Sequence, residues 1–296
     1  MFIDIHVHTS RVPGFPRLDG STYATPAQLI AGYDEVGIEA GCILPEANPE
    51  CCTVPQNNDD TLEVCEKFKG RFIPFCNVDP RMITNSWQAP LDRMMDYYKE
   101  RGAKGIGEVC CNLPILDPKV QNLFRCAEKC NLPLTFHLSP FVGYSYGLVD
   151  DSGLPQLEES LRRFPKLRFF GHSQTFWAEM SKINNVSERF GYPKGPVSGG
   201  RLPELMRKYP NLYGDLSAGS GCNALTRDRE NAIKFLNEFQ DRLFFGTDIC
   251  QPAMPTLRPL ATFLKDLLAK GDISQKVFNK IARENAIREL DLKLPL

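Results

Sequence analysis

Short apolar segments alternate with segments of helical spacing along almost the whole chain, and this alternation leaves few folds open. Such a pattern is typical of parallel strands, because each parallel strand needs a crossover helix before the next. Strands are expected within residues 1–9, 38–44, 71–77, 103–109, 133–138, 167–173, 211–216 and 243–248. Helices are expected within 26–36, 59–68, 90–101, 118–130, 156–164, 202–208, 229–239, 257–269 and 274–290.

Eight strands in a chain of 296 residues predict a (β/α)8 TIM barrel, an α/β fold that forms one domain at this length. We therefore expect a single domain over residues 1–296. No Gly-x-Gly-x-x-Gly motif follows an expected strand, which weighs against a dinucleotide-binding sheet. The irregular stretch from Thr175 to Ser198 is rich in Gly and Pro, and it predicts a loop insertion at about 175–200 over one end of the barrel.

Charge and hydropathy restrict the partners of this chain. The 35 basic and 36 acidic side chains nearly balance, so there is no electrostatic reason to expect nucleic acid or an anionic membrane surface. No apolar run reaches the roughly 18 residues of a transmembrane helix, and the first residues lack a signal-peptide layout. We expect a cytoplasmic protein with a small-molecule substrate, and homo-oligomerisation stays open.

The eleven cysteines are odd in number and scattered from Cys42 to Cys250, so we expect reduced thiols rather than a disulfide framework. Cys110 and Cys111 come two and three residues after Glu108, an acidic residue at an expected strand end. This position leaves two further roles open for them, a soft metal ligand or a redox-sensitive thiol.

All four histidines of the chain lie at the ends of apolar runs. His6 and His8 are two residues apart in the first expected strand, so both imidazoles would point to one face. His137 and His172 end the fifth and sixth strands, and the carboxyl ends of barrel strands form the active-site face. The alternative for an isolated His-x-His pair is one core histidine and one surface histidine.

Carboxylates end two further strands, Glu108 on the fourth and Asp248 on the eighth. Taken singly, Glu108 could form a loop salt bridge, Asp248 could cap a helix and His172 could be a core histidine. Together with the histidines they make a donor set that suits Zn²⁺, and also Mn²⁺, Fe²⁺ or Ni²⁺. Such an ion lowers the pKa of bound water to about 7, and a nearby carboxylate can take the proton.

These motifs resemble the amidohydrolase superfamily, in particular the amidohydrolase 2 type related to aminocarboxymuconate-semialdehyde decarboxylase, with some TatD-like features. The residues that carry the resemblance are His6-Val7-His8, Gly105-Ile106-Gly107-Glu108, His137, Gly171-His172-Ser173, Asp215-Leu216-Ser217 and Gly246-Thr247-Asp248. The similarity extends over nearly the whole chain and implies a metal-dependent TIM barrel.

The resemblance implies a role for each of these positions. His6, His8, His137 and Asp248 would ligate the principal metal, and Asp248 would also act as the acid/base. His172 would be a second-metal ligand or an acid that polarises the substrate. Glu108 is similar to the bridging carboxylate of binuclear TatD-like members, so one or two ions, most readily zinc, stay open.

The leading hypothesis is a metal-dependent hydrolase of an amide, ester or lactone, which the presence of Glu108 favours. One alternative is a metal-dependent non-oxidative decarboxylase on the same barrel. Another is a non-catalytic metal-binding protein, which the filled ligand positions disfavour. Tyr144, Tyr146 and Trp177 are candidate pocket walls, although aromatic packing within loops would equally explain them.

Overall fold

A barrel of eight parallel strands forms the centre of the computed structural model, which describes residues 1–294. The barrel strands are β1 (Phe2–Val7), β2 (Ile38–Ile43), β3 (Phe72–Pro74), β4 (Ile106–Val109), β5 (Leu134–Ser139), β7 (Phe169–His172), β8 (Leu212–Asp215) and β9 (Leu243–Phe244). A two-residue strand, β6 (Leu148–Val149), pairs with the end of β5 and was not expected from the sequence.

The barrel closes through two short contacts between its sheets. Strands β1, β2 and β3 form one sheet, and β4, β5, β7, β8 and β9 follow one another in the second. A parallel bridge joins Cys76 to Ile106, and another joins Ile249 to Val7. The Ile5 amide also donates to the Phe245 carbonyl oxygen at 3.0 Å, so β1 meets the chain that follows β9. The predicted TIM barrel is confirmed.

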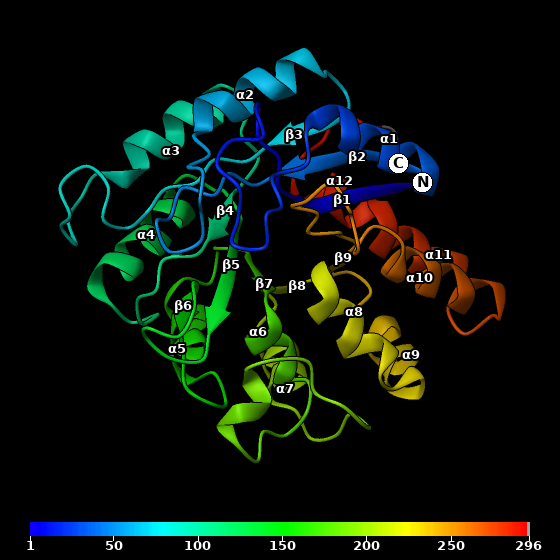
Figure 1. The fold of residues 1–296 in the computed structure, drawn as a ribbon. Helices are drawn as coiled ribbons and strands as arrows, with labels where there is room; N and C mark the ends of the chain where they lie inside the picture. Colours follow the sequence, from blue (N-terminus) through cyan, green and yellow to red (C-terminus); the bar gives the residue numbers. More distant parts are fainter. Residues whose placement is uncertain (295–296) are drawn as a thin grey trace.

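Helices surround the barrel and link its strands (Figure 1). They are α1 (Pro26–Val36), α2 (Asn58–Lys67), α3 (Leu91–Glu100), α4 (Pro118–Lys129), α5 (Pro155–Arg163), α6 (Gln174–Ala178), α7 (Arg201–Lys208), α8 (Ala218–Thr226), α9 (Arg229–Glu238), α10 (Pro259–Ala269), α11 (Gln275–Asn279) and α12 (Asn285–Glu289), with η1 (Val186–Arg189) and the π-helical η2 (Lys280–Glu284). Local sequence explains where several helices begin. Thr25 precedes Pro26 and forms a capping box with Gln28 at the start of α1, and Asp117 caps α4.

The core has an inner layer within the barrel and an outer layer between strands and helices. Ile3, Ile5, Phe75, Phe170 and Phe244 belong to the inner layer, which fills the barrel. The register of β1 against β2 shifts between Asp4 and Val7. We infer that this shift turns Asp4 towards the Tyr33 hydroxyl of α1, 2.7 Å away, while His6 and His8 face the barrel interior.

Three expected elements differ from the structure. The stretch expected as a loop from Thr175 to Ser198 contains α6 and η1, and α6 begins because the Ser173 hydroxyl accepts from the Phe176 amide. Helix α8 was missed because its Gly-Ser-Gly sequence has low helix propensity. The eighth strand, expected over 243–248, is a regular strand only at Leu243–Phe244.

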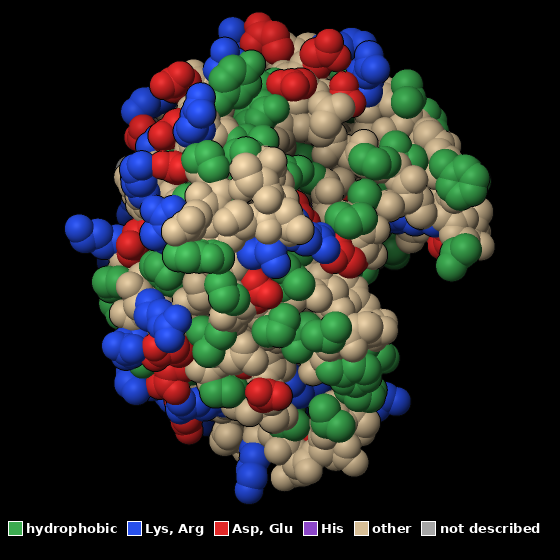
Figure 2. Space-filling view, turned by 90° about the vertical axis from the view of Figure 1, so that its left-hand side faces the viewer, with side chains coloured by type: hydrophobic (Ala, Val, Ile, Leu, Met, Phe, Trp, Pro, Cys, Tyr) green, Lys and Arg blue, Asp and Glu red, His purple; other side chains and the backbone are tan. Residues whose placement is uncertain are grey.

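The surface carries mixed charge. Lys and Arg side chains alternate with Asp and Glu on the face seen in Figure 2, and no histidine is visible there. The histidines are hidden because all four are buried, with at most 4% of each residue exposed. Within residues 1–294, no helix combines the length and apolar content that crossing a bilayer requires. Nothing observed tests the single-domain prediction, which stays a prediction.

Candidate metal centre

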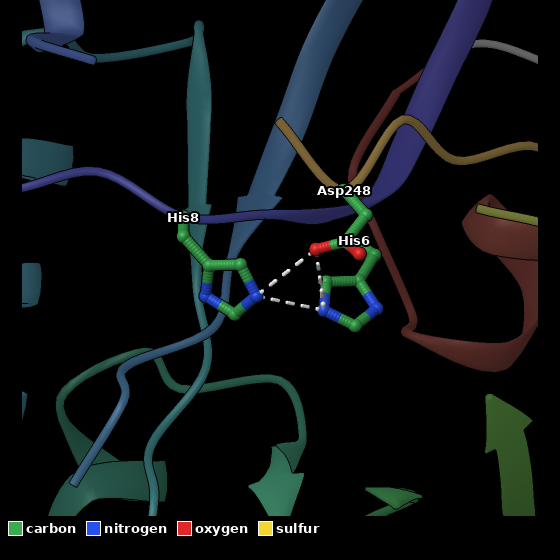
Figure 3. Close-up of side chains that lie close together, drawn as sticks. All are labelled: His6, His8 and Asp248. Atoms are coloured by element: carbon green, nitrogen blue, oxygen red, sulfur yellow. Dashed lines mark hydrogen bonds and ion pairs between the residues drawn. The ribbon is translucent and has the colours of Figure 1, made fainter. Parts of the chain in front are cut away.

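His6 in β1 and His8 directly after this strand point at one another across a very short gap (Figure 3). The Nε2 atoms of His6 and His8 lie 3.0 Å apart, and both residues are buried. The His6 Nδ1 atom lies 2.6 Å from Asp215 Oδ2, and the His8 Nδ1 atom lies 2.8 Å from the Leu44 carbonyl oxygen.

These contacts determine which nitrogen carries the proton. A carbonyl oxygen and a carboxylate oxygen only accept hydrogen bonds, so Nδ1 of each ring is the donor. In the neutral rings both Nε2 lone pairs then face each other at 3.0 Å, which is repulsive unless a positive charge lies between them. A divalent cation bound by both Nε2 atoms would satisfy this geometry, as in other imidazole-rich metal sites.

Asp248 completes this group from the chain that follows β9, directly beside β1. Its Oδ1 atom lies 3.3 Å from His8 Nε2 and 3.7 Å from His6 Nε2. Donor atoms of His6, His8 and Asp248 all lie within 4.8 Å of one another. The Asp248 backbone has φ of 53°, in the left-handed region that few non-glycine residues adopt, and its amide donates to the His6 carbonyl oxygen at 2.8 Å.

Glu108 lies between His6 and His8 on one side and His137 on the other. Its Oε2 atom is 3.5 Å from Nε2 of both His6 and His8, and its Oε1 atom accepts from His137 Nδ1 at 2.8 Å. The Nε2 atom of His137 is buried and has no hydrogen-bond partner within the described chain. An unpartnered buried nitrogen is unfavourable in a protein interior and fits a site that takes a ligand.

His172 and Asp215 form the side of the site nearest β7 and β8. The His172 Nδ1 atom lies 3.0 Å from the Ser217 hydroxyl and 3.4 Å from Asp215 Oδ2. Its Nε2 atom lies 3.6 Å from Asp248 Oδ2. Asp215 therefore contacts Nδ1 of two histidines, and its Oδ1 atom accepts from the Ser217 amide at 3.0 Å.

Electrostatics show that the cluster attracts positive charge. Burial opposes protonation of His6, but Asp215, Glu108 and Asp248 raise its pKa to about 9. Burial likewise opposes protonation of His172, yet Asp215 and Asp248 hold its pKa well above the ordinary value. Although burial works in the opposite direction, the histidines keep the pKa values of Asp215 and Asp248 below the usual range. A cation among these carboxylates would take the place of the protons.

A cavity of about 450 Å³ opens onto this cluster from the carboxyl ends of the strands. His8, Glu108, His137 and Asp248 line its floor, so six predicted site residues lie at or beside one cavity once His6 and His172 are included. Its further lining residues are Arg17, Leu18, Asp19, Glu46, Cys51, Thr53, Tyr146 and Cys250.

The candidate pocket walls divide into three cases. Tyr146 lines the cavity, and its ring centre is 4.5 Å from that of His137, an approach that Gly147 permits with its φ of 110°. Tyr144 is exposed and packs against the Phe190 ring instead, with the ring centres 5.0 Å apart. The expectation for Trp177 is wrong, because its side chain is buried in the core and its Nε1 donates to the Asp215 carbonyl oxygen at 3.0 Å.

Sequence reasoning missed two buried contacts at the rim of the site. Glu46 follows the expected second strand after Pro45, in a polar stretch without a motif. Its Oε1 atom lies 3.8 Å from His8 Nδ1, and its carboxylate accepts from the Tyr23 hydroxyl. Arg17 packs over the Tyr23 ring, 4.4 Å from its centre, beside the Cys250 thiol. No local pattern marks a pair such as Tyr23 and Glu46, since only the fold brings them together.

Solved structures with the same fold include proteins of different activity. An uncharacterised TIM-barrel protein from Bordetella bronchiseptica is 17% identical, with a TM-score of 0.63 and 98% of each chain covered. A probable 2-pyrone-4,6-dicarboxylic acid hydrolase from Acinetobacter baumannii, with citric acid bound, is 15% identical (TM-score 0.59; 98% of this chain and 99% of that chain). A 5-carboxyvanillate decarboxylase from Sphingomonas paucimobilis is 16% identical (TM-score 0.62; 99% of each chain).

The sequence itself identifies the family. No curated protein matches the chain. The family model described as amidohydrolase matches residues 3–292, which include every histidine and carboxylate of the cluster. The buried His and Asp groups are consistent with a metal site, as the resemblance implied. The chain belongs to the amidohydrolase 2 family.

Proposed function

We propose that this protein is a metal-dependent hydrolase that cleaves an amide, ester or lactone of a small molecule. The observation that carries the proposal is the pair of facing Nε2 atoms of His6 and His8, 3.0 Å apart, with Asp248 beside them. His6, His8 and Asp248 would hold the principal metal, for which we propose zinc because of its affinity for imidazole and carboxylate donors. Such a metal, when bound, supplies the Lewis acidity that makes water a nucleophile near neutral pH.

The chain's own residues supply the proton transfers. The side chains of His6 and His8 are almost fully buried, whereas that of Asp248 is 25% exposed. The Asp248 carboxylate can therefore accept a proton from water in the cavity. His172 is buried next to Asp248, with its Nε2 atom 3.6 Å from Asp248 Oδ2, and we assign to it the donation of a proton to the oxygen or nitrogen that leaves. Ser217 and Asp215 orient His172 through Nδ1.

Glu108 supports hydrolysis as the reaction class. Its carboxylate lies 2.8 to 3.8 Å from a ring nitrogen of each of the four histidines, which supports a role in bridging two cations or fixing one. Whether it ligates is part of the proposal. The cavity of about 450 Å³ lies within the range of small-molecule sites, which agrees with a small substrate.

A non-oxidative decarboxylase is the second candidate function. It is supported by the similarity of the fold to 5-carboxyvanillate decarboxylase, with a TM-score of 0.62. The similarity to the probable 2-pyrone-4,6-dicarboxylic acid hydrolase is comparable, with a TM-score of 0.59. Cytoplasmic location and homo-oligomerisation stay predictions that neither candidate function requires.

Two assays on one substrate library separate the candidates. A hydrolase should release acid and incorporate ¹⁸O from solvent water into the product. A decarboxylase should release CO₂ and place a solvent proton on the former carboxylate carbon. The proposal predicts ¹⁸O incorporation that disappears in the Asp248→Asn variant, whereas CO₂ release without ¹⁸O incorporation would contradict hydrolysis.

A further inference from the structure

A second cavity, which we call the α4 groove, lies on the outer ring of helices and has a volume of about 680 Å³. It shares no lining residue with the cavity above the metal centre. Pro118, Gln121, Asn122 and Arg125 line it from one face of α4, because their spacing follows the turns of the helix. Helix α3 packs beside α4 (Figure 1) but leaves this face open. A ligand could therefore bind on α4 without entering the barrel.

Large apolar side chains border the α4 groove. Trp87, in the segment before α3, is 59% exposed, and Leu116 is 36% exposed. Phe164, directly after α5, also lines the groove and is partly buried against the core. A planar ring placed against the Trp87 indole would remove apolar area of both groups from water. The volume of the groove lies within the range of small-molecule sites.

The α4 groove carries positive charge. Arg125 and Arg163 line it, and no Asp or Glu among residues 1–294 does so. Arg163 is already paired, because its Nε atom donates to Glu159 Oε1 at 2.6 Å. Arg125 differs, since no carboxylate of the described chain forms an ion pair with it. An anion in the groove would provide the partner that Arg125 lacks within this part of the chain.

A buried amide holds the Arg125 guanidinium in position. Asn122 is 4% exposed, and its Nδ2 group donates to the Ala89 carbonyl oxygen at 2.9 Å. Its Oδ1 atom accepts from Arg125 Nε at 3.2 Å and from Arg125 Nη2 at 2.6 Å. Because this acceptor is neutral, the guanidinium keeps its full charge, and its remaining N–H groups can donate to a carboxylate. A side chain that is already ordered also loses less entropy when a ligand binds.

We propose that the α4 groove binds a small aromatic carboxylate, whose ring lies against Trp87 and whose charge is paired with Arg125. The apolar walls favour the ring, and the two arginines without an acidic neighbour in the lining favour the negative charge. The inference goes beyond the proposed function and is independent of it, because the groove and the metal centre have no residue in common.

Fluorine NMR of the full-length chain labelled with 5-fluorotryptophan tests the proposal, with 2-naphthoate as the probe. The chain has two tryptophans, and Trp177 is buried in the core, so one of the two resonances reports on the groove. Trp87→Phe assigns that resonance. We expect 2-naphthoate to shift the Trp87 resonance and not that of Trp177, with a dissociation constant below about 1 mM.

Two further probes separate charge from ring. 2-Naphthylmethylammonium has the same ring and the opposite charge, and cyclohexanecarboxylate has the charge without the aromatic ring. Each should bind at least about tenfold more weakly than 2-naphthoate, because each loses one of the two interactions.

Arg125→Gln tests the residue that carries the charge. This variant should bind 2-naphthoate about tenfold or more weakly than wild type, because a charge-assisted hydrogen bond is lost. Arg101→Gln is the matched control: Arg101 is also exposed and packs on an aromatic ring, that of Tyr97, but it does not line the groove. The control should bind the probe as wild type does.

Several outcomes would overturn the proposal. They are a Trp87 resonance that shows no saturable shift with 2-naphthoate, equal affinity for the ammonium probe, and unchanged affinity in Arg125→Gln. A Trp87 resonance that shifts with protein concentration alone would show that a second copy of the chain covers the groove, and this would also contradict the proposal. None of these results bears on metal binding by His6 and His8, which is measured separately.

Discussion

Asp215→Asn tests whether the carboxylate behind His6 and His172 sets the affinity of the proposed metal site. The Asp215 carboxylate lies 2.6 Å from His6 Nδ1 and 3.4 Å from His172 Nδ1, so one charged group orients two imidazoles. An asparagine keeps the size but offers one oxygen, and its NH₂ group would face a donor N–H. Loss of such a partner typically weakens metal binding 10- to 100-fold, or about 1.4 to 2.7 kcal/mol. Because the 2.6 Å contact is short and charge-assisted, we expect the upper end of that range.

The assay is the dissociation constant for Zn²⁺, measured by competition with a fluorescent chelator. Asp150→Asn is the control: Asp150 is also fully buried, but it accepts from the backbone amides of Gln156 and Leu157 at the start of α5. The control should bind Zn²⁺ as the wild type does. An Asp215→Asn protein that keeps its circular dichroism spectrum and binds Zn²⁺ within about twofold of wild type would refute the reasoning.

Three further predictions concern chemistry, pH and packing. Asp248→Asn should retain the fold and lower kcat by about 10² to 10⁴, in steady-state assays corrected for metal content, because it loses the general base. Burial raises the pKa of Asp150 from 3.8 to about 6, so its contribution to stability is present below pH 3.8 and is lost as pH rises through about 6. Wild type should therefore lose about 3 kcal/mol more than Asp150→Asn between these limits in urea unfolding; equal pH profiles would contradict this. Gly41→Ala should lower the free energy of unfolding by about 1 to 3 kcal/mol, because the new Cβ would lie 2.2 Å from the Tyr33 hydroxyl; wild-type stability would show that Tyr33 moves freely.

The site residues at the strand ends could be predicted, because side-chain alternation within a strand and the place of the residue along it restrict where each side chain points. His6 and His8 share a face in any extended segment, and barrel topology brings His137, His172 and Asp248 to the same end. The local sequence pattern could not predict which metal-ligating side chains group together. His137 was expected beside His6, His8 and Asp248, but its donor atoms group with those of Glu108 and Cys110. That His137 ligates the principal metal remains untested.

Contacts made by loops were the least predictable. Trp177 reads as a loop aromatic in the sequence, yet it is buried because α6 packs it against the β8 backbone. Glu46 is one of many polar loop residues in the sequence, but the fold brings its Oε1 atom 3.8 Å from His8 Nδ1. Each contact depends on the conformation of a loop over the barrel, and tertiary packing determines this conformation.

The metal content of purified protein tests the central claim most directly. Elemental analysis of wild-type protein never exposed to chelator should find about one or two equivalents of divalent metal, most of it zinc. His8→Ala should keep the circular dichroism spectrum and lose most of the metal, because one of the two facing Nε2 atoms is gone. Wild-type protein with less than about a tenth of an equivalent, and with no uptake on reconstitution, would contradict the account.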